Sequence, residues 1–139
     1  MEEIINILEK ENINNINEIS PLALSFIGDS VYELVIRTKV ISDGNKKIKK
    51  IHDNKNKYVC ASFQALLITK IKDLLTEEEN NIYKRARNSH KMSKAKNQNI
   101  SDYRKATGLE AVIGYLYLTK NMDRLLDIIN IGIKRINDE

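Results

Sequence analysis

The stretch that decides the fold class is Pro21–Arg37, with the sequence PLALSFIGDSVYELVIR. Ser20 and Pro21 form a typical helix start, because a serine side chain caps free amides and proline has no amide hydrogen to leave unpaired. Apolar residues then follow around nearly the whole circumference of the predicted helix. We therefore expect a helix that is mostly buried.

Asp29 lies inside this apolar helix, directly after Gly28. A carboxylate in a partly desolvated place must be paired or must bind a metal ion, because an isolated buried charge is costly. An alternative interpretation stays open. Ser25, Asp29, Glu33 and Arg37 share one stripe of the helix, and a solvated stripe with an ordinary Glu33–Arg37 pair has the same spacing.

A second acid stands in the apolar stretch TGLEAVIGYLYL, Thr107 to Leu118, where Glu110 is the sole charge. Here too a simpler interpretation exists, since Thr107 and Glu110 have the spacing of a capping box at a helix start. Gly108 and Gly114 would let another backbone approach closely, as helix packing or a dimer contact requires. Neither acid alone indicates a particular activity.

The rest of the chain is typical of an all-α protein with about six helices, since it has one Pro, five Gly and few alternating stretches. Helix starts are predicted at Thr76 with Glu79, at Ser101 with Asp102, and after Asn121. Ser42–Lys47 and Asn88–Ile100 are predicted loops. The length of the second loop indicates a functional or disordered connection.

The 139 residues fit a single domain, 1–139, with its core at about 20–136. Cys60 has no partner for a disulfide, which favours a reducing cytoplasm, and we expect it to be a small core residue. The acidic N-terminus does not resemble a secretory signal, and no apolar stretch is long enough to cross a bilayer. We expect a cytoplasmic protein with no membrane partner.

The net charge of +4 is unevenly distributed. Lys46–Lys57 carries a net charge of +5 and Lys84–Lys105 carries +7, so the remaining residues are net acidic. This asymmetry favours a surface that binds a polyanion. Two solvated lysine-rich faces without a partner would have the same composition, and that alternative stays open.

Taken together, GDSVYE (Gly28–Glu33) and GLEAVIGYLYL (Gly108–Leu118) resemble the ribonuclease III endonuclease family. Within that family the chain is similar to the short branch called Mini-ribonuclease III. The similarity extends over the segments YVCASFQA (Tyr58–Ala65), LTEEE (Leu75–Glu79), KRARN (Lys84–Asn88) and YRKAT (Tyr103–Thr107). The resemblance implies a homodimeric, all-helical endonuclease domain that cuts double-stranded RNA with Mg²⁺. The usual task of the branch is to mature the precursor of 23S ribosomal RNA.

The resemblance also implies which residues form the site. Asp29 and Glu110 match acids of the family and are expected to be catalytic and to bind the metal. Full-length members carry further acids at the positions of Leu22, Ser25 and Thr107, which are not acidic in this sequence. They also carry a separate double-stranded-RNA-binding domain, and we do not expect such a domain here. RNA affinity is then expected from basic residues of the catalytic domain, namely Lys84, Arg85, Arg87, Lys91, Lys94 and Lys96, with Lys46–Lys57 as a second candidate surface.

Two carboxylates suit this chemistry, because Mg²⁺ prefers oxygen ligands and is commonly held by one or two acids and a substrate phosphate. A metal-activated water would hydrolyse the phosphodiester and leave a 5′-phosphate and a 3′-hydroxyl. His52 and His90 lie among lysines and are not expected to act as bases. One alternative function stays open, a catalytically silent helical dimer that binds structured RNA during ribosome assembly.

Overall fold

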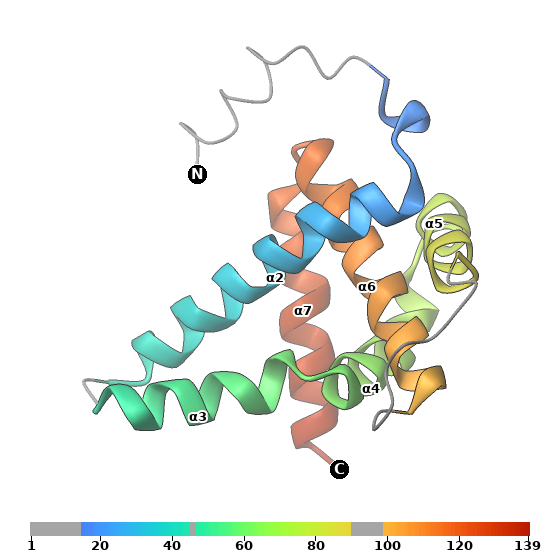
Figure 1. Ribbon diagram of the computed structural model, residues 1–139. Helices are drawn as coiled ribbons and strands as arrows, with labels where there is room; N and C mark the ends of the chain where they lie inside the picture. The colour runs from blue at the N-terminus through green and yellow to red at the C-terminus, as the bar shows by residue number, and fades with distance from the viewer. Residues whose placement is uncertain (1–14, 45–46, 90–98) are drawn as a thin grey trace.

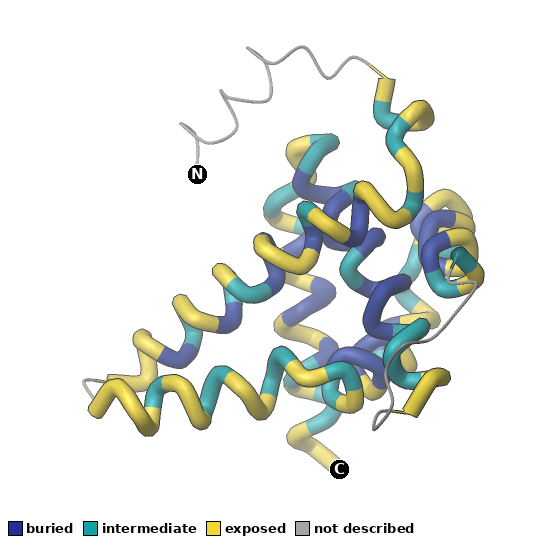
Figure 2. The backbone as a smooth tube through the Cα atoms, in the orientation of Figure 1, coloured by how far each residue is buried: buried dark blue, intermediate teal, exposed yellow. Residues whose placement is uncertain are grey.

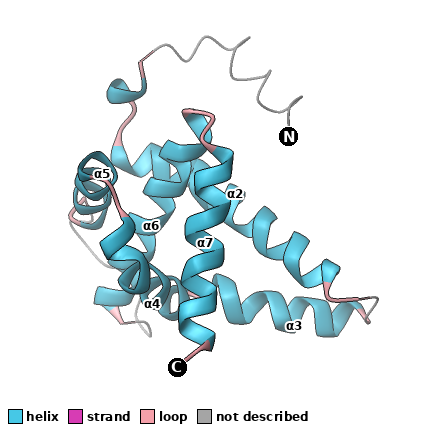
Figure 3. Ribbon diagram, turned by 180° about the vertical axis from the view of Figure 1, so that it is seen from behind, coloured by secondary structure: helices cyan, strands magenta, loops and turns pink. Residues whose placement is uncertain are grey.

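The computed structural model describes residues 15–44, 47–89 and 99–139. These residues form six α-helices and two short 3-10 helices, with no strand among them, which confirms the expected all-α class (Figures 1 and 3). The elements are η1 Ile16–Glu18, α2 Pro21–Ser42, α3 Ile48–Val59, α4 Ala61–Ile71, η2 Lys72–Leu74, α5 Glu77–Arg87, α6 Ile100–Leu118 and α7 Met122–Asn137.

Helix α6 runs through the middle of the molecule and packs against α2, α4 and α5, with α7 against α4 (Figures 1 and 2). The apolar stretch of α6 that ends at Leu118 is almost entirely buried within this single chain. Its side chains Leu109 and Ile113 meet Tyr32 of α2 and Leu67 of α4 in one continuous core. The centre of the fold is therefore the helix that carries Glu110.

A side chain caps the start of three of the six described α-helices, α2, α5 and α6. The Ser20 hydroxyl accepts a hydrogen bond from the Ala23 amide at 3.1 Å, as predicted. Thr76 and Glu79 form the predicted capping box, with bonds of 3.1 and 2.8 Å. The predicted start at Ser101 is wrong by one residue, because α6 begins at Ile100 after Asn99, whose side chain accepts from the amide of Asp102.

Glu79 has a second role that spacing does not reveal, because it is a buried acid. Nε and Nη2 of Arg124 each donate to its carboxylate at 2.6 Å, and Nη2 also donates to the Leu74 carbonyl at 2.7 Å. Burial acts to raise the pKa of Glu79, but the hydrogen bonds from Arg124 and Thr76 outweigh it and hold the pKa below its usual value. This charged network fastens α5 to α7.

Helix α2 is less buried than its composition predicts. Four large apolar side chains of α2 are exposed, and that of Phe26 is 82% exposed. The others are Leu22, Leu34 and Ile41. At 3.6 residues per turn all four fall within about a third of the helix circumference. These four exposed apolar side chains share this side of α2 with the ion pair of Glu33 and Arg37, and we call it the α2 face. Figure 2 shows exposed and buried positions alternating along α2.

Cys60 is exposed, so the expectation of a core residue is wrong. The chain is extended at Cys60, where α3 ends and α4 begins, and the side chain lies outside both helices. Its sulfur is 3.3 Å from the Ser62 hydroxyl.

Within the described residues no helix combines the length and the hydrophobicity that a bilayer crossing needs.

Candidate active site

The candidate site is built on a crossing of α2 and α6 in which the two backbones touch. A Cβ atom on Gly28 would lie 1.7 Å from the carbonyl oxygen of Glu110, and one on Gly114 would lie 2.0 Å from that of Leu24. Only glycine fits at either position, because such distances are far inside van der Waals contact. Asp29 follows Gly28 directly, so the crossing brings it next to Glu110.

The two acids line one open pocket of about 270 Å³. The remaining walls come from the break between α3 and α4 and from the first half of α6. The lining residues are Asp29, Val59, Ala61, Gln64, Tyr103, Ala106, Thr107 and Glu110. Carboxyl groups 81 residues apart in the chain thus meet in space, as the resemblance implies.

The two carboxyl groups differ in their surroundings. Asp29 is exposed, which corrects the expectation of a desolvated aspartate, whereas Glu110 is mostly enclosed. Burial, followed by the hydrogen bond and the negative charge of Asp29, raises the pKa of Glu110 to about 8. Without a cation the pair therefore holds a proton at neutral pH, and a divalent ion would take the place of that proton.

Gln64 of α4 is a third polar group in the pocket, and the sequence analysis missed it. Its side chain is buried, with its Nε2 donating to the Val59 carbonyl at 3.0 Å. It also forms a hydrogen bond with Glu110 that lowers the pKa of this acid. Its Oε1 is buried and has no hydrogen-bond partner among the described residues. A polar residue on the buried side of an otherwise apolar helix is the signal that could have identified it.

Ser25 and Thr107, which stand where full-length family members carry acids, join α2 to α6. The Ser25 hydroxyl donates to the Thr107 carbonyl at 2.8 Å. Thr107 lies well inside α6 and its hydroxyl donates to the Tyr103 carbonyl at 3.0 Å, so it caps no helix start. The capping-box interpretation of Thr107 and Glu110 is therefore wrong.

The other predicted residues lie elsewhere. Glu33 and Arg37 form the ordinary surface pair, 2.8 Å apart. Lys84 and Arg85 are exposed on α5, and Arg87 is half-buried at its end. Lys91, Lys94, Lys96 and His90 lie outside the described residues, and His52 is exposed on α3 away from the pocket.

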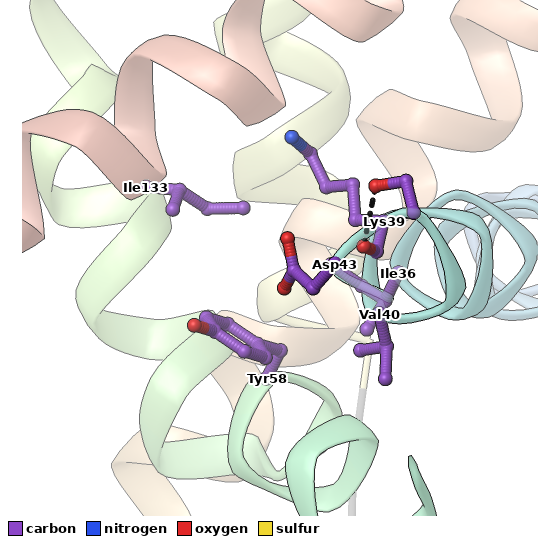
Figure 4. Close-up of a pocket in the computed structure, with 7 residues that line it drawn as sticks. Ile36, Lys39, Val40, Asp43, Tyr58 and Ile133 are labelled. Carbon is purple, nitrogen blue, oxygen red and sulfur yellow. Dashed lines mark hydrogen bonds between the residues drawn. The ribbon is translucent and has the colours of Figure 1, made fainter. Parts of the chain in front are cut away.

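A different pocket, of about 200 Å³, lies between the end of α2, α3 and α7 (Figure 4). Lys39 and Asp43 extend toward Tyr58 and Ile133 there, and Ile36 and Val40 complete its apolar part. It contains neither predicted acid and has no cluster of carboxylates. The pocket that holds Asp29 and Glu110 is therefore the better candidate for catalysis.

The oxygen atoms of the candidate site suit a hard divalent cation. No group of three or more His, Cys, Asp and Glu side chains suited to a metal occurs among residues 15–44, 47–89 and 99–139. Two carboxylates and one side-chain amide, that of Gln64, nevertheless provide three oxygen-bearing groups among the residues that line this pocket. Mg²⁺ is commonly held by few protein oxygens and retains several waters, so this set fits it.

Comparison with known proteins identifies the family. The sequence profile of the ribonuclease III domain matches residues 22–121, which include both acids and most of the core. The chain belongs to the ribonuclease III family. This membership confirms the expected class of enzyme, an endoribonuclease.

Relatives within the ribonuclease III family match over most of their length. Proteins named Mini-ribonuclease 3 from Streptococcus pneumoniae and Thermoanaerobacter are 43% and 41% identical, over 88% and 95% of this chain and 97% and 91% of their own. The Staphylococcus aureus protein of that name is 36% identical, over 94% of this chain and 99% of its own. A crystal structure of a Fusobacterium nucleatum protein matches with a TM-score of 0.78 and 39% identity, over 86% of this chain and 97% of that one.

Proposed function

We propose that this ribonuclease III-family enzyme hydrolyses double-stranded RNA with a Mg²⁺ ion held by Asp29 and Glu110. The observation that carries the proposal is the meeting of these two carboxyl groups in one open pocket at the α2–α6 crossing. The substrate we propose is the precursor of 23S ribosomal RNA, processed in the cytoplasm. The match to proteins named Mini-ribonuclease 3 supports it.

The residues of the pocket have distinct tasks in this proposal. Bound Mg²⁺ supplies an activated water and neutralises charge on the phosphate. Glu110, whose pKa is raised, would hold the ion as a carboxylate once its proton has left to solvent, and the exposed Asp29 would hold it from the side that faces solvent. Gln64 holds the Glu110 side chain in place from α4. The products are a 5′-phosphate and a 3′-hydroxyl.

The test of catalysis is Asp29→Asn, with Asp43→Asn as the matched control at the far end of α2. We expect Asp29→Asn to retain the fold and the affinity for a long RNA duplex but to lose cutting in Mg²⁺, because the amide has one oxygen fewer and no charge. Asp43→Asn should cut like the parent. Cutting by Asp29→Asn at the parent rate would remove Asp29 from the site.

A homodimer completes the proposal, because a duplex has two strands and one site cuts one of them. Two-fold pairing of identical chains gives two sites related by symmetry. The α2 face supports this, since it exposes four large apolar side chains, Phe26 most of all, and exposed apolar side chains that gather on one side of a helix are typical of an interaction surface. Phe26→Glu should yield a monomer in sedimentation experiments, with Leu126→Glu on α7 as the control. A parent protein that sediments as a monomer at working concentrations contradicts this part.

In this proposal, basic residues of α5 and of the chain that follows it provide the contacts to RNA. We propose that the exposed Lys84 and Arg85, and the half-buried Arg87, contact phosphates. We propose the same role for Lys91, Lys94 and Lys96, which the sequence also predicts to bind RNA. Such contacts weaken steeply with salt, because each releases counterions from the RNA. Replacing Lys91, Lys94 and Lys96 together with Gln should lower the affinity and flatten its salt dependence.

The second candidate function is a catalytically silent helical dimer that binds structured RNA. The engagement of Ser25 with Thr107, in place of two further acids, favours it. The same assay separates the two candidates. Binding of a duplex without cleavage at saturating Mg²⁺ would support the silent module and would contradict an active nuclease.

A further inference from the structure

Another pocket lies beside the candidate active site, at the junction of α5 and α6. Its charged side chains are basic, whereas those of the candidate active site are acidic. Its volume is about 380 Å³. The residues that line it are Arg87 and Asn88 at the end of α5, and Ile100, Ser101, Arg104 and Lys105 in the first turns of α6. Three of the six are cationic and none is acidic. We call it the basic pocket.

Among residues 15–44, 47–89 and 99–139, no carboxylate forms an ion pair with the cations of the basic pocket. The ion pairs formed within the described part of the chain include neither Arg87, Arg104 nor Lys105. Nε of Arg104 is buried and has no hydrogen-bond partner among the described residues. A buried donor without an acceptor is costly, so Arg104 is a donor that an incoming anion can satisfy.

The neighbouring residues add to the positive charge. The guanidinium of Arg87 lies 5.4 Å from the Tyr83 ring centre, and the Lys72 ammonium lies 4.7 Å from the same ring. Burial and then the charges of Arg87, Lys84 and Lys105 lower the pKa of Lys72. Of these two cations only Arg87 lines the basic pocket, and the residues that line it include no carboxylate to offset the charge. Such an excess of positive charge favours a multiply oxygenated anion.

The geometry of α6 links the basic pocket to the acidic one. Tyr103, Ala106, Thr107 and Glu110 line the acidic pocket, whereas Ser101, Arg104 and Lys105 line the basic one. At 1.5 Å per residue, Arg104 lies about 9 Å along the helix from Glu110, and at about 100° per residue the two groups occupy different faces. The two pockets are therefore fixed to one helix about 9 Å apart along its axis, a separation that an extended ligand such as an RNA duplex can span.

We infer that the basic pocket binds a non-scissile phosphate of the RNA backbone, with Arg104 as the principal donor and Arg87 and Lys105 beside it. The proposal rests on the proposed function. The planar guanidinium of Arg104 donates two parallel hydrogen bonds to phosphate oxygens, which an ammonium group cannot do. The contact fixes where the duplex lies relative to Asp29 and Glu110, and so Arg104 is a positioning residue.

The test uses Arg104→Met, which keeps the apolar stem and removes the charge, Arg104→Lys, and Lys134→Met on α7 as the control. Affinity for a 30-base-pair RNA is measured in EDTA over a range of salt concentrations. We expect Arg104→Met to bind about 10-fold more weakly and to reduce the salt slope by about one ion, because one phosphate contact is lost. Arg104→Lys should keep the slope with an intermediate affinity, and Lys134→Met should match the parent.

A second measurement locates the phosphate. Duplexes that each carry one uncharged methylphosphonate are tested against the parent and Arg104→Met. In the parent, one position near the cut should weaken binding, and that penalty should disappear in the variant. Unchanged affinity and slope in a folded Arg104→Met, with a parent that binds and cuts RNA, would overturn the basic pocket alone. A parent that neither binds nor cuts the duplex would instead overturn the proposed function.

Discussion

The replacement of Glu110 by Gln tests the electrostatics of the candidate site. Glu110 is enclosed beside Asp29, and its pKa is raised from 4.5 to about 8. Because the folded pKa lies above the unfolded one, the folded state binds more protons between these values. The metal-free protein therefore loses stability as the pH rises from about 4.5 to about 8. Glutamine has nearly the same shape and no charge, so Glu110→Gln should not have this loss.

The size of the effect follows from the shift. Each pKa unit corresponds to about 1.4 kcal/mol, so a shift to about 8 sets an upper limit of about 5 kcal/mol. The pocket is open to water on the side of Asp29, which screens part of this energy. We expect Glu110→Gln to be about 2–4 kcal/mol more stable than the parent at pH 8.5, and nearly equal to it at pH 4.5.

Urea unfolding in EDTA, measured by circular dichroism at several pH values, gives these free energies. Glu77→Gln, an exposed acid in the first turn of α5, is the control and should not gain stability progressively with pH. Adding Mg²⁺ at pH 8 should stabilise the parent but not Glu110→Gln, because the ion requires the carboxylate. A stability difference that stays constant from pH 4.5 to 8.5 would refute the reasoning.

Three further substitutions test the supporting structure. Gly28→Ala places a Cβ 1.7 Å from a backbone oxygen, so we expect a loss of about 3 kcal/mol or more in chemical denaturation, together with loss of cutting. Arg124→Met leaves the buried Glu79 without its cation and should cost about 2–4 kcal/mol in thermal unfolding, part of which the added change Glu79→Gln restores. Gln64→Leu should weaken Mg²⁺ binding about 10-fold in calorimetry while Gln64→Glu retains it. If Gln64→Leu and Gln64→Glu lost Mg²⁺ affinity equally, Gln64 would have no role in binding the metal.

The features that the sequence predicts well are local. Ser20 and Thr76 cap their helices as expected, because a cap depends on residues within one turn. The meeting of Asp29 with Glu110 was an expectation from family resemblance, since spacing within either helix cannot indicate a contact 81 residues away.

The features that were missed depend on tertiary contacts. Gln64 is polar in an apolar helix, and its importance comes from what packs against it. Cys60 was expected inside the core because a free cysteine usually behaves as a small apolar residue, yet it is exposed at the junction of α3 and α4. Likewise, a run of apolar residues does not show whether the rest of the chain covers them. For that reason α2 was expected to be mostly buried, whereas its residue Phe26 is exposed.

The contact of Gly28 with the Glu110 carbonyl has a consequence for how the enzyme is assembled. The crossing that closes the centre of the core is the same crossing that pairs the two acids, so the chain cannot complete one without the other. Folding intermediates in which α2 has not docked would then be unable to cut RNA. Denaturation should therefore abolish nuclease activity and helical structure in a single transition.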